Sequence, residues 1–156
     1  RGNDLPVFIG HTGDWRCMMS LIKGQKHVKS SWVSKSQVYD KPWGFERQWA
    51  AHGPVGGKIL HIKAGNRTSL KYNTLKDECL FVLDGVIRVQ YGTERTIADP
   101  VQHPFQYAEL GHGECLVIQS GCPYRITAEE DAQVVEISET KYQNKTIRIE
   151  DDYGRK

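Results

Sequence analysis

Short apolar or alternating stretches recur along residues 41–156, and turn residues separate them at intervals of roughly 8 to 12 positions. This spacing is typical of a β-sandwich or a β-barrel. Helical periodicity is scarce and is best, although weak, at residues 15–23. The pattern predicts strands at residues 44–50, 58–63, 68–72, 78–83, 86–91, 106–110, 114–119, 124–127, 133–138 and 146–149.

The predicted strand that begins at Glu78 is apolar on both faces. Leu80 and Val82 share one side with Glu78, whereas Phe81 and Leu83 lie on the opposite side. We therefore expect this strand to be covered twice. The barrel interior covers one side, and a neighbouring sheet or a second subunit covers the other.

The next predicted strand, residues 86–91, alternates apolar and polar residues as a half-solvated strand does. Gly85 precedes it in "LDGVIRV", and Gly121 occurs in "SGCPY". Both sequences predict tight turns between two strands, because glycine readily adopts a positive φ.

Residues 1–40 have a different character from the rest. "LPVFIG" could form a strand, and "SSWVSKSQ" indicates a Ser-rich polar connector. We interpret residues 1–40 as an N-terminal extension that packs on the main domain or reaches a partner, and residues 41–156 as the main domain.

Composition limits the functional classes. A chain of 156 residues and 17.8 kDa is long enough for one domain with a proper core. The net charge of +2 does not favour nucleic acid or an anionic membrane as a partner. No apolar stretch approaches the roughly 20 residues that span a bilayer, and no signal peptide is visible. The four cysteines form no CxxC pair, which favours free thiols in the cytoplasm or another reducing compartment.

Candidate chemistry centres on residues 65–85 and on a second segment at residues 113–124. The first segment holds Gly65, Lys71, Asn73, Glu78 and Gly85, and the second holds Gly113, Gly121 and Tyr124. At this spacing the chain resembles a cupin, which implies an all-β double-stranded β-helix, or jelly-roll, barrel.

Within the cupins the chain looks most like the C-terminal domain of type II mannose-6-phosphate isomerases, which are often fused to mannose-1-phosphate guanylyltransferase. The segments that carry this resemblance are "KPWGFE", "SLKY", "GECLVIQSGCPYRI" and "IRIEDDYGR". They cover roughly residues 41–156, and the resemblance implies recognition of a sugar, a sugar phosphate or a nucleotide sugar.

The resemblance places Lys71, Asn73, Glu78 and Tyr124 where the family holds its metal. Only Glu78 is a good ligand for a divalent cation, because a protonated lysine repels the ion and Asn and Tyr are weak donors. We therefore predict no metal and no cofactor. One hypothesis is that the Lys71 ammonium replaces the metal and pairs with Glu78, with Asn73 and Tyr124 completing the hydrogen bonds. The alternative is that Lys71 extends to the barrel mouth.

Other residues are candidates for ligand contacts. Arg125 and Arg148 could bind a phosphate bidentately, and Lys58 offers a point charge. His61 could rebuild a metal site with Glu78, although a hydrogen-bonded or exposed strand histidine is the commoner case. The competing interpretation of the tail is that its acidic residues and Arg155 tie the C-terminus to the barrel.

Three functional classes stay open. The first is a non-catalytic binding protein for a sugar or sugar phosphate. The second is a sugar-phosphate isomerase or epimerase, in which Glu78 with Lys71 or Tyr124 supplies the base and the electrophile. The third is a structural subunit of a larger assembly. We favour the non-catalytic classes, with a homodimer or a larger assembly as the oligomeric state.

Overall fold

The computed structural model describes residues 30–140 and 146–155. The chain divides into two compact units, residues 1–33 and residues 34–156, and every described helix and strand belongs to the second unit. The predicted helix at residues 15–23 and the predicted strand in "LPVFIG" lie outside the described residues.

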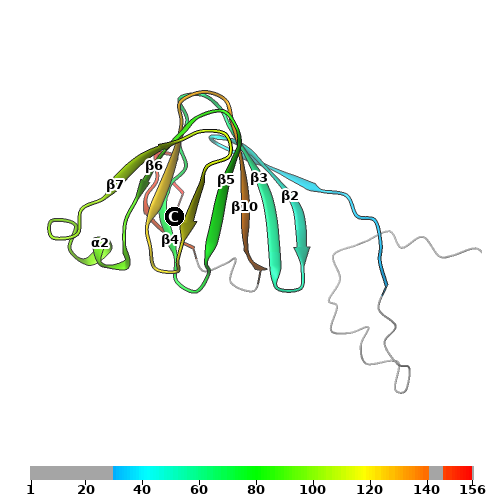
Figure 1. Ribbon diagram of the computed structural model, residues 1–156, viewed down its shortest axis with the longest axis horizontal. Coiled ribbons are helices and arrows are strands. Elements are labelled where there is room, and N and C mark those ends of the chain that lie inside the picture. The colour runs from blue at the N-terminus through cyan, green and yellow to red at the C-terminus, as the bar shows by residue number, and fades with distance from the viewer. Residues whose placement is uncertain (1–29, 141–145, 156) are drawn as a thin grey trace, which may run out of the picture. The chain divides into compact units, whose positions relative to one another are not determined.

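The second unit consists of two sheets in which all the paired strands are antiparallel (Figure 1). The six-stranded sheet has the order β1 (Gln37–Lys41), β2 (Gly44–His52), β3 (Val55–Ile62), β10 (Ala132–Glu139), β5 (Glu78–Asp84), β8 (Cys115–Ile118). The five-stranded sheet has the order β11 (Thr146–Glu150), β4 (Leu70–Asn73), β9 (Tyr124–Ala128), β6 (Ile87–Tyr91), β7 (Gln106–Leu110).

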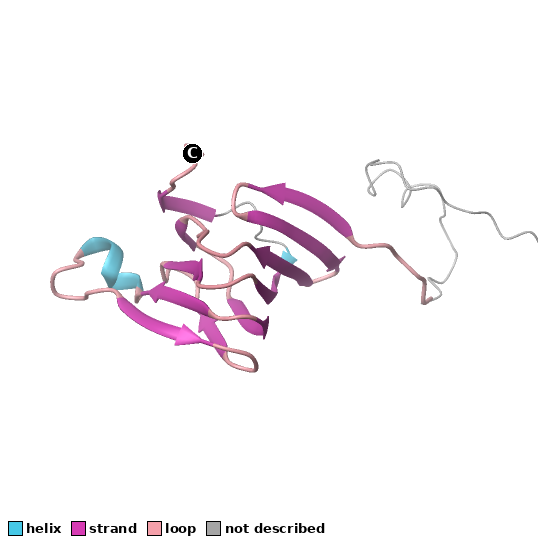
Figure 2. Cartoon of the chain, turned by 90° about the horizontal axis from the view of Figure 1, so that it is seen from above, coloured by secondary structure: helices cyan, strands magenta, loops and turns pink. Residues whose placement is uncertain are grey.

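All ten predicted strands are present, with small shifts at their ends. Two elements were not predicted. β1 has almost only exposed residues and pairs with β2 alone, so no apolar pattern marks it, and it crosses the boundary expected at residue 40. The short helix α2 (Glu94–Ala98) buries only Thr96, which is too little to show a helical period, and it connects β6 to β7 (Figure 2).

The glycine turns connect the two sheets. Gly85 follows β5 and precedes β6, and these strands lie in different sheets; Gly121 likewise lies between β8 and β9. Both residues have positive φ, 80° and 83°, as predicted. The turns lie between two strands, as predicted, and at each of them the chain passes from one sheet to the other. At Gly85 a Cβ atom would lie 2.4 Å from the Asp131 carbonyl oxygen, so glycine is required there.

The core lies between the inner faces of the two sheets. Alternation within each strand turns every second side chain inward. The buried apolar cluster consists of Trp43, Leu60, Ile62, Leu80, Val82, Ile87, Val89, Ile118, Tyr124, Ile126, Ala128, Ala132 and Val134. Because strands from both sheets contribute, the interior of the barrel is also where polar residues from distant segments meet.

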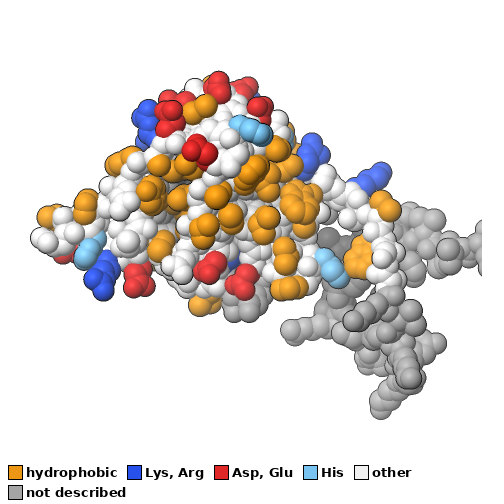
Figure 3. All heavy atoms as spheres, in the orientation of Figure 1, with side chains coloured by type: hydrophobic (Ala, Val, Ile, Leu, Met, Phe, Trp, Pro, Cys, Tyr) orange, Lys and Arg blue, Asp and Glu red, His pale blue; other side chains and the backbone are white. Residues whose placement is uncertain are grey.

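The outer face of the six-stranded sheet is apolar and exposed. Phe81 is 38% exposed, Ile137 is 49% exposed and Val117 is 70% exposed. Hydrophobic side chains gather across the middle of the face seen in Figure 3. We expected both sides of β5 to be covered. Among the residues that the structure describes, only its inner side is covered. A second subunit over the outer side stays a prediction.

Candidate functional site

A buried polar group lies in the barrel interior where β4, β5 and β9 approach one another. The Glu78 carboxylate, 3% exposed, accepts hydrogen bonds at Oε2 from Asn73 Nδ2 and from the Tyr124 hydroxyl, both at 2.7 Å. Thr146 donates in turn to Asn73 Oδ1 at 2.6 Å. The structure therefore brings together three of the four residues that the sequence assigned to the degenerate metal site.

A lysine occupies the other side of the carboxylate, but it is not the predicted one. Lys76 Nζ lies 2.5 Å from Glu78 Oε1 and 3.6 Å from Glu136 Oε1, and the Lys76 side chain is 5% exposed. The Lys71 ammonium instead lies over the Tyr124 ring, 5.1 Å from its centroid. Glu78 does form an ion pair, but with Lys76, so the predicted pair between Lys71 and Glu78 was wrong. We call Asn73, Lys76, Glu78, Tyr124 and Glu136 the central cluster.

The sequence analysis missed two members of the central cluster. Lys76 precedes β5 in the loop sequence "TLKDE", where the pattern indicates only a polar turn. Glu136 did leave a signal. It follows Val134 by two residues on β10, so alternation turns it inward with a completely buried valine. A carboxylate at such a position needs a cationic partner.

The charges and the burial of the central cluster determine which of two of its groups, Glu136 and Tyr124, is ionised at neutral pH. Burial by itself raises the pKa of Glu136, but Lys71, Lys58 and Lys76 outweigh it and lower that pKa below its ordinary value. Burial, together with Glu78 and Glu136, raises the pKa of Tyr124 well above 10. Glu136 is therefore ionised at neutral pH, and Tyr124 keeps its proton and donates it in a hydrogen bond.

A cavity of about 230 Å³ lies between the sheets beside the central cluster. The charged residues that line it are Lys41, Glu46, Lys58, Lys71, Glu136, Arg148 and Arg155. Lys41 and Lys58 both lie near Glu46, at 3.4 and 3.5 Å. Burial lowers the pKa of Lys58, but Glu136 and Glu46 outweigh it, so the net shift is upward and the side chain stays cationic. Cations outnumber carboxylates in this lining, which suits an anionic ligand.

The residues present do not suit a catalytic metal ion. Such a site needs about three ligands drawn from His, Cys or carboxylates, with one position open. Among the described residues, no group of three His, Cys, Asp or Glu side chains comes together in that way. The ammonium of Lys76 also stands against the only carboxylate at the predicted metal position, where it would repel a cation. The donor set therefore fits an ammonium and not a divalent ion.

Arg125 does not reach the interior cavity. Tyr124 and Ile126 on the same strand point into the core, so Arg125 points outward, where it donates to the Thr68 carbonyl at 3.1 Å and to Glu150 at 3.0 Å. Arg148 and Lys58 do line the cavity. Of the predicted phosphate contacts, the structure therefore brings two to the cavity and leaves Arg125 outside.

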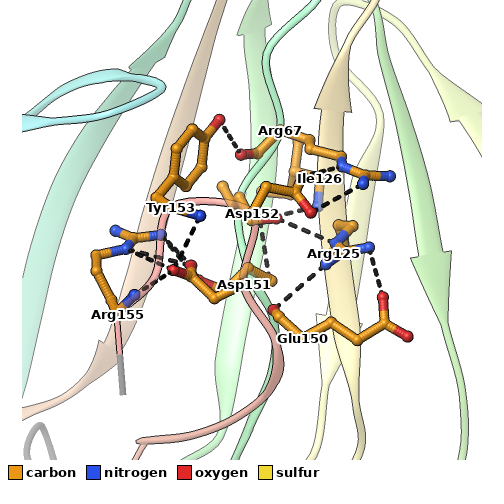
Figure 4. A network of polar contacts seen from close by, with 10 residues as sticks. Arg67, Arg125, Ile126, Glu150, Asp151, Asp152, Tyr153 and Arg155 are labelled. Atoms are coloured by element: carbon orange, nitrogen blue, oxygen red, sulfur yellow. Dashed lines mark hydrogen bonds and ion pairs between the residues drawn. The ribbon is translucent and has the colours of Figure 1, made fainter.

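The tail is tied to the barrel by several ion pairs, which Figure 4 shows from close by. The Arg155 guanidinium beside Asp151 holds the pKa of that carboxyl well below its ordinary value, and Ser69 donates to the same carboxylate at 2.6 Å. Arg67 pairs with Asp152 and lowers its pKa in the same way. We call these contacts, together with the Arg125–Glu150 pair, the C-terminal clasp.

His61 is separated from the central cluster. Leu60 and Ile62 point into the core, so His61 points to the outer face of the six-stranded sheet. Its ring stacks on Phe45 with centroids 4.1 Å apart. Burial and the nearby Arg47 lower its pKa, so the imidazole is neutral at pH 7. The structure does not bring His61 and Glu78 together.

No family model and no curated protein sequence matches the chain. Solved structures do match it. Oxalate decarboxylase from Bacillus subtilis superposes with a TM-score of 0.65 and 18% identity over 79% of this chain and 33% of that one. The capsular polysaccharide assembling protein CapF from Staphylococcus aureus gives a TM-score of 0.59 and 14% identity, over 76% of this chain and 34% of that one. KdgF from Halomonas sp. gives a TM-score of 0.56 and 14% identity, over 69% and 89%.

These likenesses show the fold alone. Together with the two antiparallel sheets, they identify the barrel as the predicted cupin jelly roll. The chain spans about a third of the length of the oxalate decarboxylase and CapF chains. The finer resemblance to mannose-6-phosphate isomerases stays a prediction. Within the part of the chain that the structure describes, no helix has the length and apolar character needed to cross a membrane.

Proposed function

We propose that this cupin-fold chain is a non-catalytic binding protein for a sugar phosphate or a nucleotide sugar, or a subunit with that role in an assembly. The observation that carries the proposal is the engagement of Glu78, which is the one residue at the predicted metal position able to ligate a metal well. Asn73 and Tyr124 hold one of its oxygens, and Lys76 lies 2.5 Å from the other. The Lys76 ammonium beside Oε1 stands where a metal ion would have to bind and repels it.

The cavity beside the central cluster supports an anionic ligand. Lys58, Lys71 and Arg148 line it, and each can hold a negative charge. A phosphate group is a good match for this chemistry, and the polar side chains of Ser69 and Thr146 in the same lining can bond sugar hydroxyls. The predicted ligand contacts Lys58 and Arg148 therefore keep their proposed role in this cavity, whereas Arg125 and His61 do not line it.

The isomerase alternative receives less support. A general base works best with a pKa near the operating pH. Glu136 lines the cavity, but its pKa is lowered by the surrounding lysines, which makes it a weak base. Tyr124, with its pKa raised well above 10, keeps its proton at neutral pH and is no base. Lys71, Glu78 and Tyr124 therefore support the fold and the ligand in this proposal instead of moving a proton.

The test combines binding with metal analysis. We expect mannose 6-phosphate to raise the Tm of the purified chain, and a ligand at 100 times its Kd stabilises the native state by about 2.7 kcal/mol. We expect Lys58→Met to weaken this shift, while the exposed Lys63→Met control leaves it unchanged. A stoichiometric bound transition metal, or conversion to fructose 6-phosphate with or without added Zn²⁺ or Co²⁺, contradicts the proposal.

The oligomeric state is a separate part of the proposal. The exposed apolar face of the six-stranded sheet is compatible with a homodimer, as the double apolar pattern of β5 predicts. Sedimentation equilibrium is expected to give twice the 17.8 kDa of the chain. A monomer at micromolar concentration overturns this part and leaves the ligand proposal standing.

A further inference from the structure

A second and larger cavity lies on the outside of the barrel, away from the central cluster. Its volume is about 470 Å³, which is in the range of small-molecule sites. Side chains of β6, β7 and β9 line it, and those strands turn their apolar residues the other way, into the core. The outer face of the five-stranded sheet therefore has its own polar surface, separate from the interior.

The strand register arranges this surface in two rows. In one row Arg125 on β9, Gln90 on β6 and Tyr107 on β7 are direct cross-strand neighbours. In the next row Thr127 pairs with Arg88 on one side and with Arg67 on the other. Neighbouring strands lie about 4.8 Å apart, and successive residues on one face lie about 6.8 Å apart. The two rows thus form a grid on the scale of one or two sugar rings.

The lining of this cavity is positively charged. Among the described residues three arginines and no carboxylate line it, although Glu109 on β7 is the cross-strand neighbour of Arg88 outside the lining. Their ion-pair partners, Asp152, Glu129 and Glu150, lie outside the lining. These pairs fix the guanidinium groups without using all their donors, because a guanidinium has five N–H groups.

Two of the arginines keep donors for a ligand. Arg67 bonds Asp152 through Nε and Nη2, and Arg88 approaches Glu129 through Nη2. Among the described residues, the Nη1 groups of both have no hydrogen-bond acceptor. Both can therefore donate to an additional oxyanion without breaking an existing pair.

Tyr107 supplies a different kind of contact. It is 64% exposed and lines the cavity. Covering an exposed aromatic ring with a ligand removes apolar surface from water, which favours binding. An aromatic face beside hydrogen-bonding Gln90 and Thr127 suits the C–H face and the hydroxyl groups of a sugar ring. The arginines then suit an acidic group on that ring.

We propose that the Arg67–Arg88–Arg125 face of the five-stranded sheet binds an acidic saccharide, with an oxyanion on the arginines and a sugar ring on Tyr107. The carboxylate of a uronic acid and the phosphate of a sugar phosphate share this chemistry. The site does not depend on the ligand of the interior cavity, because the two cavities open on opposite faces of the same sheet.

The test is calorimetric titration of the full chain with trigalacturonate and with glucose 6-phosphate, and with neutral maltotriose as the uncharged comparison. We expect one or both acidic sugars to bind and maltotriose not to bind; the tighter of the two identifies the oxyanion. Arg88→Ala is expected to weaken the binding about tenfold, which corresponds to about 1.4 kcal/mol. Tyr107→Ala is expected to weaken it several-fold.

Arg95→Ala is the matched control, since it removes an equal charge from the exposed surface of α2, outside the cavity. Arg88 and Tyr107 are themselves exposed, so neither variant disturbs the core, and an unchanged Tm checks this. The proposal is overturned if neither acidic sugar binds, if maltotriose binds equally well, or if Arg95→Ala weakens binding as much as Arg88→Ala.

Discussion

The central cluster and the Arg67–Asp152 pair of the C-terminal clasp both consist of a lysine or arginine paired with a carboxylate, but water reaches them very differently. In the central cluster Lys76 and Glu78 are 5% and 1% exposed at their side chains. In the clasp Arg67 and Asp152 are 46% and 37% exposed. A buried charge without its partner is very costly, whereas an exposed one is solvated by water. We therefore expect the buried ion pair of the central cluster to contribute to the stability of the fold, and the exposed pair of the clasp mainly to position the C-terminal segment.

The largest effect is expected from Lys76→Ala. This change leaves the Glu78 carboxylate buried without its ammonium, so we expect the free energy of unfolding to fall by about 3 to 5 kcal/mol. Urea unfolding followed by circular dichroism measures it. Lys63→Ala, at an exposed position shortly after β3, is the control and is expected to change stability by less than about 0.5 kcal/mol.

A double variant sharpens the same comparison. The double variant Lys76→Met, Glu78→Gln removes both charges. We expect it to recover at least half of the unfolding free energy that Lys76→Ala loses, since removing a complete buried ion pair often changes stability little. A loss below about 1 kcal/mol for Lys76→Ala would mean that the carboxylate finds water or another cation, and the contrast between the two regions would fail.

The second effect concerns Arg125, which is buried although it belongs to the clasp. Arg125→Ala removes the bond to the Thr68 carbonyl just before β4 and the bond to Glu150 at the end of β11, and we expect a loss of about 2 kcal/mol in the free energy of unfolding. Limited proteolysis should then cut the C-terminal strand sooner. Arg88→Ala, the same change at a 57% exposed side chain, serves as its control with a small expected effect. If both variants lost the same unfolding free energy, the burial of Arg125 would not explain its contribution to stability.

The pH dependence of stability is the third test. A carboxyl whose pKa is lower in the native state than in the unfolded state stabilises the native state at any pH above its ordinary pKa. This stabilisation is lost as the pH falls toward the native pKa. Glu136, Asp151 and Asp152 all behave in this way. We therefore expect the Tm to fall below about pH 4.5.

The alkaline side follows from the groups whose pKa is raised. Lys58 and Tyr124 stabilise the native state fully when the pH is below their ordinary pKa values. This stabilisation is lost as the pH rises through their raised native pKa values. We expect the Tm to fall above about pH 10. A Tm that is constant from pH 3 to pH 11 would contradict the assigned charges on both sides.

The smallest effect is expected for the exposed Arg67–Asp152 pair. Arg67→Ala should change the Tm by less than about 4 °C, since exposed pairs contribute little. Differential scanning calorimetry in low and high salt measures the change, and salt should reduce the difference further. A larger loss than that of Lys76→Ala would reverse the order on which the comparison depends.

The strands were predictable because their signal is local. Alternation of apolar and polar residues marked every strand whose one face is buried, and glycines marked the corners at residues 85 and 121. β1 escaped because it buries no face of its own. The resemblance to the two cupin motifs also predicted Asn73 and Tyr124 as partners of Glu78, and both donate hydrogen bonds to it.

The sequence by itself determined the positions of ten strands and the types of residue at the positions where the resemblance puts a metal, because alternation and residue type act within a few neighbours. Only the tertiary structure decided that Lys76, and not Lys71, neutralises this carboxylate, and that Arg125 and His61 face away from it. The reason is physical. Whether a loop lysine is buried depends on what packs over it, and strands from distant parts of the chain supply that cover.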